Sequence, residues 1–270
     1  MQKVSEYNER TMEKLPVLLS IPHGGTEVPE ELNNHVCITD KDLFDDMDPF
    51  TRQIYDLGPR VKAVVSSNIA RAFLDMNRAA DDLPPQNPDG IIKSMTCYKK
   101  QIYIKGKEPD EALRRQLVDR YYTLYHRKLR EITSSSKEVI LALDCHSMAI
   151  KAPPIAPDTG KDKRKRPLIC LGNGRGKTCD RETMEKLAAC LCEAFSIEER
   201  DVTVNDPFAG GYITRTYGNN PVPWVQVEMN RILYLSSPWF DPVTLKIDNR
   251  RLIELNHMFQ KALELFFGAK

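Results

Sequence analysis

The stretch that decides the fold is residues 15–29, LPVLLSIPHGGTEVP. Its first part, Leu15–Ile21, is short and mostly apolar, which is typical of a strand buried inside a sheet. The run stops at Pro22, and His23 follows at once, ahead of a glycine pair. Open α/β sheets hold their sites at the carboxyl ends of their strands, which is where this histidine would lie. The alternative is a strand-end turn that carries a surface histidine.

Five further short apolar runs predict strands, at residues 61–67, 138–143, 167–171, 201–205 and 224–229. Apolar residues at helical spacing predict helices, at residues 48–58, 108–134, 181–196 and 242–267. Asp48 precedes Pro49, which is typical of an N-cap followed by proline at the first helical position. A small hairpin is expected near Ile102, and a glycine-rich loop over PFAGGYITRTYG, residues 207–218.

The alternation of strands and helices predicts an α/β fold. We expect a mixed, mostly parallel sheet with helices on both faces. No internal repeat or linker divides the chain, so a single domain is predicted for residues 15–270. Residues 1–14 form a polar lead-in to it.

The composition argues against several classes of protein. Lys plus Arg number 39 and Asp plus Glu number 38, which is not the basic balance of a nucleic-acid-binding protein. The basic run KDKRKRP at residues 161–167 is expected to be a solvated loop. No apolar window is long enough to cross a membrane, and the N-terminal residues lack a signal-peptide core. We therefore expect a cytoplasmic protein with no membrane or nucleic-acid partner, whose seven scattered cysteines are reduced.

Polar residues gather at the ends of the predicted strands. Side chains at the ends of several strands converge in space when those strands share one sheet. The residues concerned are His23, then Arg71, Asp75, Asn77 and Arg78, then Asp144 and His146, and finally Glu228, Asn230 and Arg231.

Two histidines and an acidic residue at these positions match a catalytic zinc site, which takes three protein ligands and leaves one position for water. Glu228 would then transfer protons. Asp144 would orient His146, because alternate residues of an extended strand share a face. A substrate carboxylate would be held through forked hydrogen bonds from Arg71, Arg78 and Arg231.

Each residue also has an ordinary structural explanation. His146 fits a satisfied structural histidine, and Asp75 and Arg78 fit a local ion pair. The DDMD segment at residues 45–48 fits a solvated helix start, where carboxylates are favoured by the helix dipole. Together these explanations require a coincidence at several separate strand ends, so we favour a site.

The ordered set PHGG, DMNR, DCHS, GGYITRTYG and VQVEMNRILY resembles the N-formylglutamate amidohydrolase family. The resemblance runs from Leu15 to the last helix. It implies a fold related to the zinc carboxypeptidases, the aspartoacylase-like deacylases and other phosphorylase/hydrolase-like proteins. It also implies zinc-dependent hydrolysis of the amide bond of an N-acyl amino acid, such as N-formyl-L-glutamate.

The resemblance implies that His23 in PHGG and His146 in DCHS are ligands of Zn²⁺. The related carboxypeptidases carry a glutamate three residues after the first histidine, whereas this sequence has Thr26 there. We therefore expect the third ligand in the DDMD segment. Asp48 fits best, and the alternatives are Asp46, Asp45 and, more weakly, Glu27.

The resemblance further implies that Glu228 is the general base and that Arg71 polarises the scissile carbonyl. Gly24 and Gly25 are expected to shape a loop that lets substrate approach the metal. The predicted substrate-binding residues are Asn77, Arg78, Tyr212, Arg215 and Arg231. The alternatives are a hydrolase of a different N-acyl amino acid or peptide-like amide, and a non-catalytic relative. The acyl group and the oligomeric state stay open.

Overall fold

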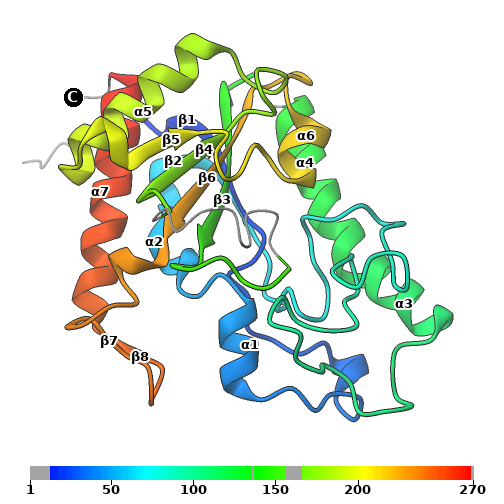
Figure 1. The fold of residues 1–270 in the computed structure, drawn as a ribbon. Helices are drawn as coiled ribbons and strands as arrows, with labels where there is room; N and C mark the ends of the chain where they lie inside the picture. Colours follow the sequence, from blue (N-terminus) through cyan, green and yellow to red (C-terminus); the bar gives the residue numbers. More distant parts are fainter. Residues whose placement is uncertain (1–12, 136, 156–165, 269–270) are drawn as a thin grey trace, which may run out of the picture.

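The computed structural model describes residues 13–135, 137–155 and 166–268. Its centre is one six-stranded sheet (Figure 1). The strands lie in the order β2 (Val61–Ser66), β1 (Leu15–Ile21), β3 (Leu141–Met148), β6 (Trp224–Asn230), β4 (Ile169–Gly172) and β5 (Val202–Val204). The first four are mutually parallel, whereas β4 runs antiparallel to β6 and parallel to β5. The predicted mixed, mostly parallel sheet is confirmed.

Helices cover both faces of this sheet, as predicted (Figure 1). One face is covered by α2 (Thr51–Tyr55), α5 (Arg181–Phe195) and α7 (Asn249–Phe267). The other is covered by α4 (Thr123–Ser135) and α6 (Tyr212–Tyr217). The remaining elements are α1 (Asp40–Asp46), α3 (Glu111–Leu117), a π-helical turn at Val118–Tyr122, short 3-10 turns, and the hairpin of β7 (Phe240–Asp241) and β8 (Lys246–Ile247).

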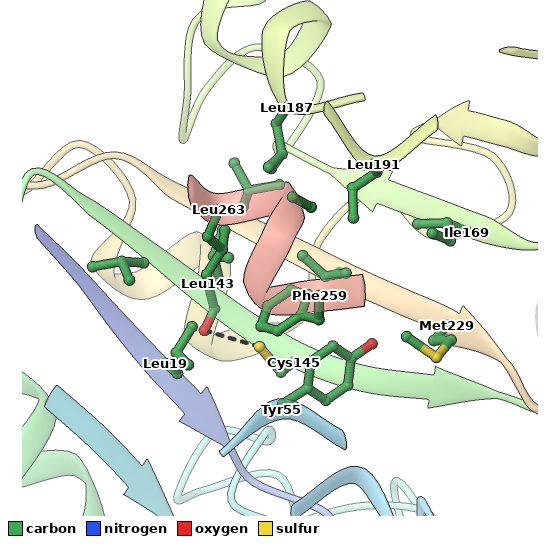
Figure 2. Packing of buried hydrophobic residues seen from close by; sticks show 14 of the residues in the cluster. Leu19, Tyr55, Leu143, Cys145, Ile169, Leu187, Leu191, Met229, Phe259 and Leu263 are labelled. Carbon is green, nitrogen blue, oxygen red and sulfur yellow. Dashed lines mark hydrogen bonds between the residues drawn. The ribbon is translucent and has the colours of Figure 1, made fainter. Parts of the chain in front are cut away.

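The central strands alternate between the two faces. Leu143 and Cys145 of β3 pack with Leu19 of β1 and Phe259 of α7 in one hydrophobic cluster (Figure 2). Successive side chains of a strand point to opposite faces, so Asp144 must face the other side. Because the sheet is covered on both faces, β1 and the first half of β3 appear in the sequence as almost continuous apolar runs.

Strand β3 is longer than predicted. The strand was expected at residues 138–143, with residues 144–147 at its end, whereas β3 begins at Leu141, continues to Met148 and contains both Asp144 and His146. Polar residues are tolerated inside this buried strand because they have partners. Asp144 accepts hydrogen bonds from Ser20 at 3.2 Å and Thr214 at 3.1 Å.

The predicted helix start at Asp48 is wrong. Helix α2 begins at Thr51, and its N-cap residue is Phe50, whose φ of 64° is left-handed. The Asp48 carboxylate instead accepts a hydrogen bond from the Ser147 amide at 3.1 Å and another from Arg231 at 3.1 Å. Contacts with distant segments therefore replace the local cap that the sequence suggested.

Four other predicted elements differ in the structure. The helix expected at residues 242–267 begins at Asn249, because β8 occupies part of the predicted range. The PFAGGYITRTYG segment is not all loop, because α6 occupies its second half. The helix expected at residues 108–134 begins after the N-cap Asp110 and is interrupted by the π-helical turn. The hairpin expected near Ile102 is reduced to isolated bridges, Val36 with Tyr103 and Met95 with Gln101. Residues 161–165 of the basic run lie outside the described residues. Among the described residues, no helix is long and apolar enough to cross a membrane.

Candidate active site

The pairing of β3 with β6 gathers four polar side chains on one face of the sheet. The register sets His146 opposite Glu228, and Asp144 opposite Gln226. Asp144 and His146 are alternate residues of β3, and Gln226 and Glu228 are alternate residues of β6. All four side chains therefore lie on the face of the sheet opposite α5 and α7. All four side chains are buried.

His23 joins this group from the neighbouring strand. It follows β1, which pairs directly with β3. The glycines after it make room for the chain's own backbone and side chains. A Cβ on Gly24 would lie 2.7 Å from the Arg52 side chain, and one on Gly25 would lie 2.3 Å from the Asn68 carbonyl carbon. Neither glycine lines the cavity described below, so the expectation that they let substrate approach is wrong.

Three buried ligand atoms converge at the carboxyl end of β1. The Nδ1 atoms of His23 and His146 are 3.1 Å apart. Asp48 Oδ2 lies 3.2 Å from Nδ1 of His146 and 3.5 Å from Nδ1 of His23. Ligand atoms bound tetrahedrally at zinc distances are separated from one another by roughly 3.3 Å. The three residues therefore form a candidate metal site whose spacing fits one small cation.

Carboxylates hold the far nitrogens of both rings. His23 Nε2 lies 2.6 Å from Asp75 Oδ1, and His146 Nε2 lies 3.2 Å from Asp144 Oδ2. A proton on Nε2 of His23 would be shared with Asp75, which leaves the Nδ1 lone pair for a metal. Nε2 of His146 also lies 3.1 Å from Asn77 Nδ2, so of its two neighbours only Asp144 can accept a proton from it. The predicted contact of Asp144 with His146 is confirmed.

The other candidates for the third ligand have different partners. Asp46 accepts hydrogen bonds from the Cys97 amide at 2.7 Å and from the fully buried Lys93 at 3.1 Å. Asp45 pairs with Lys41. Glu27 is exposed and joins the candidate metal site through no contact. Of the four acidic residues considered, the structure brings only Asp48 to the histidines.

Glu228 is the acidic residue best suited to exchange protons. Burial raises the pKa of Glu228 to about 7, and the charges of Asp48 and Asp144 act in the same direction, against opposing contributions from His146 and Arg231. A carboxyl group that titrates near neutral pH can both accept and return a proton.

A cavity of about 410 Å³ opens over the metal site and Glu228. This volume lies within the range of small-molecule sites. Of the predicted site residues, all except Tyr212 line it: His23, Asp48, Arg71, Asn77, Arg78, His146, Arg215, Glu228 and Arg231.

Comparison with known proteins identifies the family. A protein-family model described as N-formylglutamate amidohydrolase matches residues 15–235. The chain belongs to that family. Most of this family member, from β1 to the turn that follows β6, lies inside the match.

Solved structures share the fold of this N-formylglutamate amidohydrolase family member. The crystal structure of N-formylglutamate amidohydrolase from Ralstonia eutropha JMP134 matches with a TM-score of 0.77 and 20% identity, over 94% of each chain. A gene product of Agrobacterium tumefaciens matches with a TM-score of 0.63 and 16% identity, over 95% of this chain and 90% of that one. A comparison with curated protein sequences gives no match.

The arginines at the site of this family member differ in how many of their N–H donors already form hydrogen bonds within the protein. Arg231 donates to Ser147 Oγ at 3.0 Å, to Asp48 Oδ1 at 3.1 Å and to the backbone carbonyls of Asp45 and Met47. These contacts hold the Asp48 loop. They do not support the predicted use of Arg231 as a substrate clamp, because four of its five N–H donors are already engaged.

Arg71 and Arg78 both line the cavity, and neither has all five N–H donors engaged. Arg71 donates to Asp75 at 2.9 Å, and its Nε has no hydrogen-bond partner among the described residues. Arg78 donates a hydrogen bond from Nε to the backbone carbonyl of Asp89 and another from Nη2 to the Asp89 carboxylate. Arg215 is anchored through Nε to the carbonyl of Gly210 at 2.8 Å. These three guanidinium groups make the cavity suitable for an anion.

Two predicted substrate residues have contacts within the fold. Asn77 Oδ1 accepts a hydrogen bond from the Ile213 amide at 2.8 Å, so this side chain fixes the start of α6. Tyr212 does not line the cavity. Its ring lies 5.9 Å from that of His126 on α4. The structure therefore does not bring Tyr212 to the site, because the segment is a helix whose first residue packs against α4.

Asp75 was among the polar residues expected to converge, but the sequence assigned it no role at the site. Its ordinary explanation was a local ion pair with Arg78, whereas in the structure it contacts His23 and Arg71. Burial alone would raise the pKa of Asp75. The positive charges of His23 and Arg71 outweigh burial and hold this pKa well below its usual range. The sequence does contain a pattern that points to Asp75. This carboxylate lies two residues before Asn77, and Asp144 likewise lies two residues before His146.

Asp75→Asn is expected to weaken metal binding by about 10- to 100-fold, because groups that orient metal-binding histidines contribute that much. The neutral amide cannot hold the His23 proton as firmly. Zinc titration of the metal-stripped variant measures the effect. Asp89→Asn, which alters a carboxylate bound to Arg78 instead of His23, is the matched control and should retain the zinc affinity of the unaltered protein.

Proposed function

We propose that the protein is a zinc-dependent hydrolase of the amide bond in an N-acyl amino acid, with N-formyl-L-glutamate as the expected substrate. The products would be formate and L-glutamate. The convergence of His23, Asp48 and His146 beside the buried Glu228 is the observation that carries this proposal. The family match supports the reaction class.

Zinc fits the three residues at this site. His23 and His146 would bind it through Nδ1, and Asp48 through Oδ2. Two imidazoles and one carboxylate are a common ligand set of catalytic zinc, which leaves a coordination position open. When bound, zinc makes a coordinated water more acidic and polarises a carbonyl oxygen.

Glu228 would carry the proton in this reaction. As the water oxygen attacks the acyl carbon, the Glu228 carboxylate takes one of the water protons. When the C–N bond breaks, the same carboxyl group returns that proton to the leaving amine nitrogen. A pKa near neutrality suits both steps, because neither proton transfer then faces a large energetic barrier.

The arginines would bind and polarise the substrate. Arg71 lies 4.0 Å from Asp48 Oδ1, so its guanidinium is close enough to the metal site to stabilise negative charge on the carbonyl oxygen. Arg78 and Arg215 lie on the cavity wall and would bind the carboxylates of the substrate. An amino acid with an anionic side chain would use both.

A substrate panel tests this proposal. Zinc-loaded protein is assayed for released amine with the N-formyl, N-acetyl and N-succinyl derivatives of glutamate, and with N-formyl derivatives of aspartate, glutamine and leucine. We expect the highest kcat/KM for N-formyl-L-glutamate. A preference for another acyl group would replace the substrate while keeping the reaction. Failure of every amide to react, with zinc bound, would contradict the reaction itself.

A further inference from the structure

The proposed general base has one hydrogen-bonding side chain beside it. Gln226 Nε2 donates to Glu228 Oε1 at 2.8 Å. Within residues 13–135, 137–155 and 166–268, no other side chain hydrogen-bonds to the Glu228 carboxyl group. The orientation of this group therefore depends on Gln226.

The surroundings of this pair make the contact rigid. Gln226 is 5% exposed and Glu228 is 6% exposed. Both are carried by β6, which is hydrogen-bonded to β3 on one side and to β4 on the other. The backbone that carries the two residues is therefore fixed from both sides, and the i, i+2 spacing holds their side chains on one face.

The second polar atom of the Gln226 amide is free. Gln226 Oε1 is buried and has no hydrogen-bond partner among the described residues. An unsatisfied buried acceptor is unfavourable relative to a satisfied one. Within the described part of the chain, the one hydrogen bond of this amide is therefore the one to Glu228.

We propose that Gln226 is a positioning residue for Glu228 in the hydrolysis proposed above, on which this inference rests. The Nε2 donor holds one carboxylate oxygen of Glu228 and leaves the other for the attacking water. A side-chain amide has both a donor and an acceptor. After Glu228 has taken the water proton, rotation of the amide would present Oε1 to the new carboxylic acid, so the contact survives both protonation states.

Gln226→Met tests the positioning role, because methionine has a similar length but lacks the donor and the acceptor. We expect kcat for N-formyl-L-glutamate to fall about 10- to 100-fold, the loss associated with a catalytic group displaced by about 1 Å. Gln226 lines the cavity, but among the described residues its side chain hydrogen-bonds only to Glu228, so KM should stay within about twofold. Zinc content and Tm, measured on the same samples, should not fall.

A double-mutant cycle separates positioning from a general effect on the fold. In the Glu228→Gln background, Gln226→Met should change the residual rate less than about twofold, because the group that it positions is absent. The matched control is Gln260→Met on α7, which removes a similar hydrogen bond between a glutamine and Glu264 far along the chain. That variant should keep the kcat of the unaltered protein.

Two results would overturn the inference. One is an unchanged kcat for Gln226→Met. The other is a loss of the same size in the presence and absence of Glu228, which would indicate that Gln226 acts on the structure alone. The unaltered protein, assayed first, separates this failure from that of the proposed function. If it hydrolyses no N-acyl amino acid, the proposed function and the inference built on it both fail.

Discussion

Glu228→Gln is expected to lower kcat by about 10³-fold, within the range that general acid–base catalysis contributes. The substitution keeps the shape of the side chain but removes its ability to take a proton from water. Because Glu228 is not one of the three converging ligands, zinc content should stay that of the unaltered protein. Kinetics at saturating substrate, with metal analysis of the same sample, measure both quantities.

The pH profile gives an independent measure of the same residue. Glu228 must be ionised to accept a proton, so kcat/KM should rise as pH increases through its pKa. That pKa is about 7 without a metal, and a bound cation favours the carboxylate, so the acidic limb should lie at or below pH 7. The limb should be missing from Glu228→Gln.

Glu264→Gln is the matched control for this prediction. Glu264 lies on α7 and accepts a hydrogen bond from Gln260, as Glu228 does from Gln226. It does not line the cavity, so its substitution should leave kcat unchanged. A Glu228→Gln variant within tenfold of the unaltered protein, with zinc bound, would show that another group takes the proton.

Asp48→Asn is expected to abolish zinc binding at micromolar metal and, with it, hydrolysis. Loss of a direct ligand should cost more than the roughly 10- to 100-fold change in affinity that follows loss of a group orienting a ligand. The carboxylate also completes the charge balance of the site beside Arg231. Zinc titration of metal-stripped protein, followed by activity at rising zinc concentration, measures the loss.

Asp45→Asn is the matched control, because it alters the same DDMD segment at a residue that pairs with Lys41 instead of the histidines. It should keep bound zinc. Arg231 retains the backbone carbonyls of Asp45 and Met47 in Asp48→Asn, so the loop should stay folded, which a Tm measurement checks. His23→Gln gives a second test of the site. Full zinc affinity in Asp48→Asn would exclude Asp48 as the third ligand.

Local patterns in the sequence were enough to locate the sheet. Short apolar runs marked its six strands, of which the central ones are buried on both faces. Element boundaries were less well predicted where a polar residue had a distant partner. β3 extended through Asp144 and His146, and Asp48 left its expected cap position, because residues far along the chain satisfied these side chains.

The sequence by itself placed His23, His146 and Glu228 at the ends of predicted strands, and its resemblance to the family added Asp48. The tertiary structure decided which of them meet and what supports them. It distinguished Asp48 from Asp46, and it placed Asp75 on His23.

The tertiary structure also turned Arg231 toward the Asp48 loop. The physical reason is that strand periodicity is a local property, readable within a few residues. The partner of a buried charge is instead fixed by strand register and by loop contacts between residues that lie tens to hundreds of positions apart in the chain.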